Sequence, residues 1–304
     1  MNIKPGHKGD VVSAIQEKLR LEASGIFDSR TEAAVRTFQR NKGLKVDGIV
    51  GPITAGSLGI DLEAYLTTDI RDTTLTTTQG LLIHKFYMNE GQYIEGPTDK
   101  FYVFLHHTAG PHNPYATIRT WNNDDRGRIA TQFVVGNRSA EGDTTYDGLV
   151  VECFPDEAWA YHLGKNNSAL LHPHAIGIEI CNFGWLEKRG GRFYTYVNRE
   201  LPGDQVIDLG CTFRGYRYYH KYSDAQIESV SQLLQEISRR HAQVNLHLGL
   251  CEWLKTQDPA DAFNFKQDAC DGNIRGLLTH TNTRMDKSDC SPQPMLIDMI
   301  KDLC

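Results

Sequence analysis

The segment from Phe101 to Gly110 constrains the fold most strongly, because an apolar run in it ends in two histidines. It reads Phe-Tyr-Val-Phe-Leu-His-His-Thr-Ala-Gly. A continuous run of aromatic, β-branched and aliphatic residues predicts a strand that is covered on both faces of a sheet. The histidines then lie where this rigid strand meets a cleft. Because successive strand residues point to opposite faces, only one of them can face a shared site, and we expect it to be His106 rather than His107.

A zinc site needs more ligands than one strand end provides, and His280 and Cys290 can supply them. These two residues lie far along the chain, ten positions apart. Imidazole nitrogen and thiolate sulfur are common zinc ligands, and catalytic sites use three protein ligands with the fourth position open. We therefore expect His106, His280 and Cys290 to hold a catalytic Zn2+. The alternative for Cys290 is a plain buried thiol.

The composition argues against several other classes of protein. The 304 residues carry a formal net charge of -6 with both signs mixed along the chain, whereas a dedicated nucleic-acid-binding protein usually has a basic face. No apolar run approaches the roughly 20 residues that span a bilayer, and the N-terminus lacks the apolar core of a secretion signal. The seven cysteines form no Cys-x-x-Cys pair, which favours buried thiols in a reducing compartment.

Residues 1–60 are predicted to form a small all-α domain with three helices. Apolar residues recur at helical spacing in two stretches, and Pro52 suits the first turn of a third helix. The pattern Phe-Asp-x-x-Thr-x-x-Ala-Val-x-x-Phe-Gln is followed by Gly-Leu-x-x-Asp-Gly-Ile-Val-Gly-Pro-x-Thr. Together they resemble the type 1 peptidoglycan-binding domain family. That resemblance implies a three-helix fold that binds cell-wall glycan or stem peptide without chemistry.

A linker at residues 61–80 is expected to lead into a second domain at residues 81–304. Further strands are predicted at residues 131–136, 148–154 and 175–181. The sequence Ser-Asp-Ala-Gln at residues 223–226 is a capping-box pattern that begins a helix. Strands mixed with helices predict an α/β domain with a central mixed β-sheet and flanking helices. Residues 186–221 show no clear pattern, and we interpret them as a long insertion that borders the cleft.

Five motifs occur in order in the second domain. They are Leu-His-His-Thr-Ala-Gly, Thr-Gln-Phe-Val-Val, Ala-Trp-Ala-Tyr-His-Leu-Gly, Ala-Ile-Gly-Ile-Glu-Ile, and Leu-Thr-His with Asp-Cys-Ser-Pro after it. This order resembles the type 2 N-acetylmuramoyl-L-alanine amidase family, which includes phage endolysins. The resemblance implies a zinc hydrolase that cuts the amide between the lactyl group of muramic acid and the first alanine of the stem peptide. His106, His280 and Cys290 match its ligand positions; some relatives have aspartate at the third, which makes Asp289 the alternative.

Glu179 is expected to be the general base. A carboxylate in an isoleucine-rich strand is costly to bury without a partner, so its presence needs a reason. Zinc lowers the pKa of a bound water to about 7, and a nearby carboxylate can take the proton. The alternative is a structural ion pair between Glu179 and an arginine.

Three further residues are expected to bind substrate. His162 matches a position that lines the substrate groove in the family, and its alternative is a structural loop histidine. Thr131 stands where other relatives have a tyrosine, so we expect it to line the site without acting as an acid. His107 is expected beside the site, with a packed or hydrogen-bonded histidine as the alternative.

The oxyanion partner departs from the family pattern. Many relatives carry a lysine two positions before the third ligand, where it stabilises the oxyanion. Counted from Cys290, that position holds Ser288, while Lys287 lies one residue earlier. We therefore expect either Lys287 or Ser288 to act there.

The sequence thus predicts a zinc-dependent, bacteriolytic amidase of bacterial peptidoglycan, tethered to the cell wall by its N-terminal domain. Peptidoglycan is the expected partner, with no nucleic acid and no membrane insertion, and we expect a monomer. The expected role is a phage endolysin that stays in the host bacterial cytoplasm before lysis. The alternatives are a non-catalytic peptidoglycan-recognition protein and a bacterial autolysin.

Overall fold

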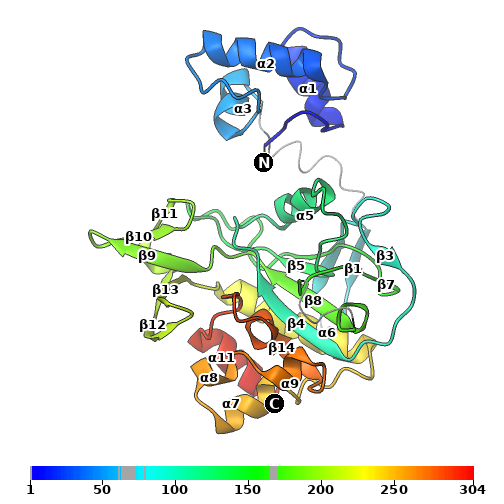
Figure 1. The fold of residues 1–304 in the computed structure, drawn as a ribbon, viewed down its shortest axis with the longest axis vertical. Coiled ribbons are helices and arrows are strands. Elements are labelled where there is room, and N and C mark those ends of the chain that lie inside the picture. The colour runs from blue at the N-terminus through cyan, green and yellow to red at the C-terminus, as the bar shows by residue number, and fades with distance from the viewer. Residues whose placement is uncertain (1, 61, 63–72, 79, 165–169) are drawn as a thin grey trace. The chain divides into compact units, whose positions relative to one another are not determined.

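A computed structural model describes residues 2–60, 62, 73–78, 80–164 and 170–304. The chain divides into two compact units, Met1–Arg71 and Asp72–Cys304 (Figure 1). None of the described helices combines the length and the apolar character needed to cross a membrane.

The described residues of the N-terminal unit include the short helices α1 (Asp10–Lys18), α2 (Ser29–Asn41) and α3 (Pro52–Leu58). The Asp28 carboxylate caps α2 by accepting a hydrogen bond of 2.8 Å from the Thr31 amide. Pro52 occupies the first turn of α3, as its missing N–H allows. The core of this unit consists of apolar side chains from the helices and their connections, chiefly Ile3, Val12, Ile15, Phe27, Val35, Val50, Ala55 and Leu58.

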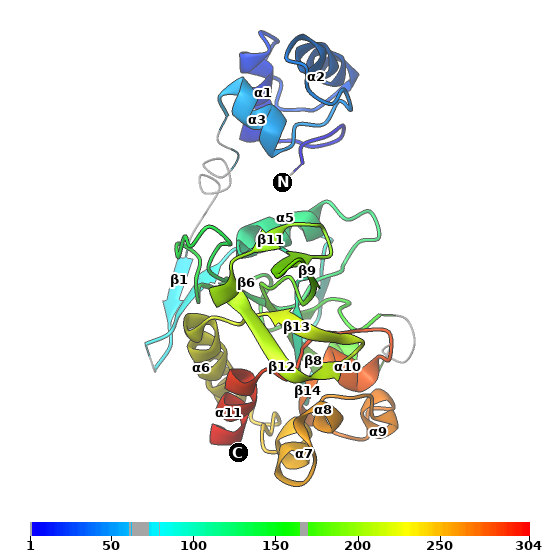
Figure 2. The same cartoon turned by 90° about the vertical axis from the view of Figure 1, so that its left-hand side faces the viewer.

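A seven-stranded mixed sheet forms the centre of the second unit (Figures 1 and 2). In sheet order its strands are β1 (Thr73–Thr76), β2 (Leu82–Lys85), β6 (Val150–Glu152), β5 (Phe133–Val135), β8 (Ala175–Ile180), β4 (Tyr102–His107) and β14 (Gly276–Thr279). The neighbours β5, β8, β4 and β14 run parallel, whereas β1 and β2, and β5 and β6, pair antiparallel. The predicted central mixed sheet is therefore confirmed. Strand β1 lies inside the segment that the sequence predicts as a linker.

Helices pack against this sheet. The longest, α6 (Asp224–Arg240), begins at the predicted capping box, in which Ser223 Oγ accepts from the Gln226 amide at 3.0 Å. Its apolar face joins the main core together with α11 (Pro294–Asp302) and α7 (Leu250–Thr256). Helix α5 (Pro114–Asn122) contacts β5 and β6. The remaining short helices are α8 (Pro259–Ala262), α9 (Gln267–Cys270) and α10 (His280–Thr283).

Alternation along β4 assigns its residues to two faces of the sheet. Val103 and Leu105 belong to the core under α6, whereas Tyr102 and Phe104 belong to a smaller cluster with Leu163, Leu171, Ala175 and Leu278. By the same alternation, His106 lies on the face of Phe104, and His107 lies on the face of α6. This pattern places His106 above the smaller cluster, at the carboxyl end of its strand.

Residues 186–221, for which the sequence shows no clear pattern, form most of a second sheet. It is antiparallel and five-stranded, in the order β11 (Glu200–Leu201), β10 (Arg192–Thr195), β9 (Trp185–Arg189), β13 (Tyr216–His220) and β12 (Val206–Phe213). We call it the accessory sheet. A separate two-stranded sheet pairs β3 (Ile94–Glu95) with β7 (Ala158–Trp159).

The cysteines differ in part from the prediction of free thiols. Cys153, Cys181 and Cys290 are buried thiols, as expected. Cys251 in α7 and Cys304 at the end of the chain are joined by a disulfide, with their Cα atoms 5.8 Å apart. The prediction of free thiols is therefore wrong for this pair.

Candidate metal centre

Two parallel strands bring His106 and His280 together. Strands β4 and β14 are neighbours, and Leu105 lies opposite Thr279. In the sequence, a histidine follows each of these two residues. Thr279 also begins α10, where its amide donates to Asn282 Oδ1 at 2.8 Å. This cap turns the chain and directs the His280 ring toward His106. The two Nδ1 atoms lie 3.1 Å apart.

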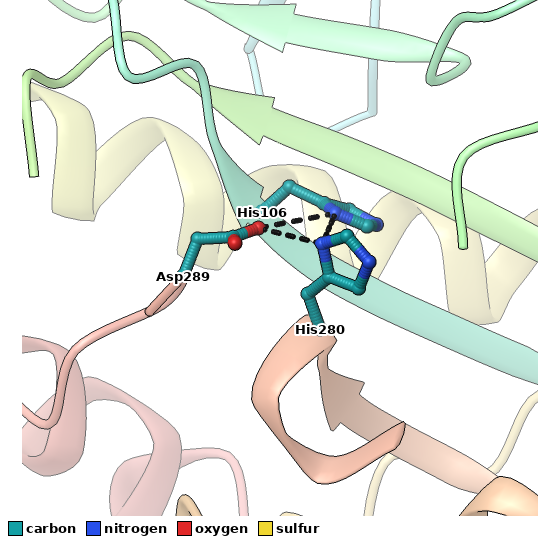
Figure 3. A group of neighbouring side chains, drawn as sticks. All are labelled: His106, His280 and Asp289. Atoms are coloured by element: carbon teal, nitrogen blue, oxygen red, sulfur yellow. Dashed lines mark hydrogen bonds and ion pairs between the residues drawn. The ribbon is translucent and has the colours of Figure 1, made fainter. Parts of the chain in front are cut away.

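The loop after α10 returns to the same point and adds a carboxylate. The Thr281 amide donates to the Asp289 carbonyl at 3.0 Å, which closes the loop. Asp289 Oδ2 then lies 2.9 Å from His280 Nδ1 and 3.4 Å from His106 Nδ1 (Figure 3). All three side chains are buried, and their donor atoms form the group that could hold a metal ion among the described residues.

The third member of this group corrects the expectation for Cys290. The structure brings Asp289, the alternative, to the two histidines instead. Cys290 is fully buried in the core shared with α6, where its thiol lies beside the Tyr222 hydroxyl. Burial raises the pKa of the Cys290 thiol well above its usual value, so the thiol is neutral in this environment. The physical reason is the loop closure, which turns residue 289 into the site and residue 290 into the core.

The donor set fits a zinc ion. With bonds of about 2.0–2.1 Å, tetrahedral ligand atoms lie about 3.3 Å apart, close to the three separations of this triangle. Burial, and then the neighbouring His280, lower the pKa of His106 to about 4, so its imidazole is neutral and has a free lone pair. Burial acts to raise the pKa of Asp289, but the adjacent His280 and His106 hold it well below its usual value. Two histidines and one carboxylate are a ligand set that catalytic zinc sites use.

His162 contacts the His106 ring on the side away from Asp289. Its Nδ1 lies 3.0 Å from His106 Nε2, the ring nitrogen that does not face Asp289. Its own backbone amide donates to His172 Nδ1 at 3.1 Å. Gly177 on β8 leaves room for this contact, because a Cβ there would come within 3.1 Å of His162 Nδ1 and 2.7 Å of Thr131 Cγ2. The structure therefore places His162 against His106, whereas the sequence predicted that it lines the substrate groove, with a structural loop histidine as the alternative.

Thr131 and His107 lie close to the site without joining the triangle. The Thr131 hydroxyl donates to the Phe133 carbonyl at 2.9 Å, and the side chain is buried against Gly177. The hydroxyl hydrogen of Thr131 is thus engaged within the protein. His107 is buried and packs its Nε2 against Gly184, where a Cβ would come within 2.6 Å. The structure thus brings His106, and not His107, to His280.

Glu179 lies beside His106 on the neighbouring strand. The two residues are in register between β4 and β8, so their side chains share one face of the sheet. Burial raises the pKa of Glu179 well above its usual value, and Asp289 raises it further, while Lys287 acts to lower it. Within the described part of the chain, no arginine forms an ion pair with Glu179, which disfavours the structural alternative. Lys287 and Ser288 are half-buried in the loop that ends at Asp289.

Comparisons with known proteins identify the family. Residues 97–264 match the family model described as N-acetylmuramoyl-L-alanine amidase, which is 168 of the 304 residues. The chain belongs to this amidase family. Residues 8–58 match the model of a putative peptidoglycan binding domain, so both resemblances seen in the sequence are confirmed. The amidase match includes His106, His162 and Glu179 but ends before His280 and Asp289.

Solved structures show weaker similarity to this amidase-family chain. PlyL is 11% identical, with 73% of this chain and 97% of that chain covered and a TM-score of 0.40. The Ph2119 endolysin from Thermus scotoductus MAT2119 bacteriophage Ph2119 is 12% identical, with coverage of 70% and 92% and a TM-score of 0.34. The N-terminal domain of SleB is 32% identical, with coverage of 19% and 89% and a TM-score of 0.19. No curated protein sequence matches the chain.

The sequence departs from the family pattern at the oxyanion position only if positions are counted back from Cys290, and the departure disappears if they are counted back from Asp289. The family resemblance implies a lysine two positions before the third ligand. Lys287 stands two positions before Asp289, whereas Ser288 held that place only when Cys290 was counted as the ligand. Counted from Asp289, the lysine of the amidase-family pattern therefore falls on Lys287.

Proposed function

We propose that this protein is a zinc-dependent N-acetylmuramoyl-L-alanine amidase that hydrolyses the lactyl–L-alanine amide of bacterial peptidoglycan. The observation that carries the proposal is the triangle of His106, His280 and Asp289, with Glu179 beside it. The family match supports the amide as the bond that is cleaved.

The residues around the triangle have distinct roles in this proposal. A zinc ion held by the triangle would supply Lewis acidity, which polarises a carbonyl group and acidifies water. Glu179 accepts a proton from the attacking water and later donates it to the nitrogen of the leaving amine. Its raised pKa suits the first step, because a more basic carboxylate accepts a proton from water more readily.

Lys287 is the proposed oxyanion partner. Its ammonium group is near enough to Glu179 and His106 to lower the pKa of both. A fixed positive charge at this position stabilises the negative oxygen that develops as water attacks the amide carbon. Loss of one such donor costs about 3–4 kcal/mol of transition-state stabilisation. Ser288 is the weaker candidate, since a neutral hydroxyl donates a weaker hydrogen bond to an oxyanion.

The N-terminal unit is proposed to tether the enzyme to the cell wall. Its match to a putative peptidoglycan binding domain supports this role. Binding through a second module raises the effective concentration of substrate at the catalytic site without any new catalytic contact. The monomeric state and the endolysin role, with residence in the bacterial cytoplasm before lysis, stay predictions from the sequence.

Digestion of purified peptidoglycan tests the proposal. The zinc-loaded protein should release new alanine amino termini, and it should release no new reducing sugar ends. Glu179→Gln should keep zinc bound at one equivalent and lose turnover, because the amide cannot accept the proton. If the wild-type protein binds the wall but frees no alanine amino termini, non-catalytic peptidoglycan recognition becomes the better account.

A further inference from the structure

The accessory sheet reaches the loop that carries Asp289. At the turn between β12 and β13, Arg214 Nη1 donates to the Met285 carbonyl at 2.7 Å, and Arg214 Nη2 donates to the Thr281 carbonyl at 3.0 Å. Both acceptors lie between His280 and Asp289 in the sequence. Figure 2 shows the β12–β13 hairpin next to α10, where this loop begins.

The turn itself is an unusual place for an arginine. Phe213 pairs with Tyr216, so Arg214 and Gly215 form a two-residue hairpin turn, with φ of 51° and 87°. Positive φ at both positions is typical of a type I′ turn, which favours asparagine or glycine because a larger side chain is strained there. Local preference therefore does not explain Arg214. The two hydrogen bonds from Arg214 to a distant loop explain why an arginine occupies this position. A strained backbone conformation persists only where the surrounding structure stabilises it.

Part of the loop that Arg214 contacts is exposed to solvent. Met285 is 71% exposed, and Asp286 beside it is exposed as well. The first residues of the loop are buried and anchored: Thr281 Oγ1 donates to the Phe263 carbonyl at 2.6 Å, and Asn282 Nδ2 donates to the Ala262 and Asn264 carbonyls at 2.9 Å. Farther along the loop, Arg284 donates to the Leu163 carbonyl at 3.2 Å. An exposed segment with few backbone bonds opens easily. The planar guanidinium of Arg214 bonds two carbonyls four residues apart, so it ties the backbone of exposed Met285 to that of the anchored Thr281.

We propose that Arg214 is a positioning residue, which holds the Thr281–Asp289 loop so that Asp289 and Lys287 stay aimed at His106 and His280. The inference rests on the proposed zinc-dependent function. The two hydrogen bonds of Arg214 go to backbone carbonyls of the loop, so Arg214 acts on Asp289 through the backbone. The accessory sheet, for which the sequence shows no clear pattern, thereby becomes part of the machinery that sets zinc affinity.

The test compares Arg214→Ala with Arg214→Lys and Arg217→Ala in the full-length protein. Arg217 is the matched control, because it lies in the same hairpin and, among the residues that the structure describes, its side chain donates hydrogen bonds to Asp208 on the partner strand alone, at 2.7 and 2.9 Å. Two quantities are measured: the zinc dissociation constant by competition with a chelator, and hydrogen exchange of the loop amides in the metal-free protein.

We expect Arg214→Ala to weaken zinc binding about tenfold, at the lower end of the roughly 10–100-fold seen when outer partners of a metal site are removed. Loop exchange should become faster, while exchange in the central sheet stays as in the wild type. Arg214→Lys should fall between, because one ammonium cannot reproduce the fork to both carbonyls. Arg217→Ala should leave both quantities unchanged.

Three results would overturn the proposal. The first is a zinc dissociation constant for Arg214→Ala within about twofold of the wild type, whether or not loop exchange is faster; about twofold is well below the effect of a lost outer partner. The second is an equal change in Arg217→Ala. The third result applies if Arg214→Ala does not fold. Arg214→Lys keeps the charge and the packing over Phe213. If its zinc dissociation constant and loop exchange equal those of the wild type, Arg214 is not a positioning residue.

Failure of the proposed function gives a different result. If the wild-type protein binds no zinc, the proposed hydrolase mechanism is wrong. Loop exchange in the metal-free variants then decides about Arg214 alone: faster exchange in Arg214→Ala supports the tie, and unchanged exchange refutes it.

Discussion

Truncating Asp289 and Cys290 to alanine, one at a time, separates the two candidates for the third zinc ligand. Asp289 Oδ2 lies 2.9 Å from His280 Nδ1, inside the triangle of donor atoms. Cys290 is fully buried in the core instead. Asp289→Ala therefore removes a charged donor from the site, whereas Cys290→Ala removes one sulfur atom from apolar packing.

The expected magnitudes differ widely. Structural zinc sites with four protein ligands bind with about 10–16 kcal/mol, or about 2.5–4 kcal/mol for each ligand. Loss of Asp289 should therefore raise the zinc dissociation constant by about 10²–10³-fold. Cys290→Ala leaves the donor atoms in place and should change zinc binding little. It should lower the free energy of unfolding by about 1 kcal/mol, because a small cavity remains in the core.

Chelator competition measures the zinc affinity of both variants, and thermal unfolding of the metal-free proteins measures their stability. Cobalt substitution adds a direct probe, because a thiolate ligand produces a sulfur-to-cobalt charge-transfer band and a carboxylate ligand does not. The wild-type protein should lack this band. Loss of zinc in Cys290→Ala, with retention in Asp289→Ala and a charge-transfer band in the wild type, would refute the reasoning from the triangle.

Three further predictions follow from the same structure. Gly177→Ala should lower the free energy of unfolding by about 1–3 kcal/mol, since its Cβ would meet Thr131 Cγ2 at 2.7 Å; an unchanged denaturation midpoint would contradict this. The metal-free protein should lose stability as pH falls from about 6.5 to about 4. His106 has its pKa lowered to about 4 in the folded state, so the unfolded state binds the proton first; the loss is about 3 kcal/mol, and a flat pH–stability curve would argue against it. Deleting residues 1–60 should weaken binding to whole cell walls more than cleavage of a soluble muropeptide, whereas equal losses on both substrates would exclude the tether.

The strand-and-helix pattern of the second unit was largely predictable, because it depends on local spacing. The apolar run before His106 forms β4, and the capping box at Ser223 begins α6 where the pattern places it. The accessory sheet was missed for the opposite reason. Its strands carry many polar side chains, so residues 186–221 lack the clear apolar alternation that marks a half-buried strand. The glycine pair Gly190–Gly191, which turns the chain between β9 and β10, was the one local indication of a hairpin.

Residue types and their order along the chain sufficed to name the two families, the histidine pair and the carboxylate of Glu179. They left Asp289 as the alternative to the expected Cys290, because the two residues are neighbours in the sequence and both are competent zinc ligands. That choice depends on contacts between segments more than 170 residues apart, namely the alignment of β14 beside β4 and the Thr281–Asp289 bond that closes the loop. The same long-range packing put His162 behind His106 and Arg214 against the loop. Local spacing specifies which face a side chain takes on its own strand, but only the assembled sheet brings side chains from different strands to one point.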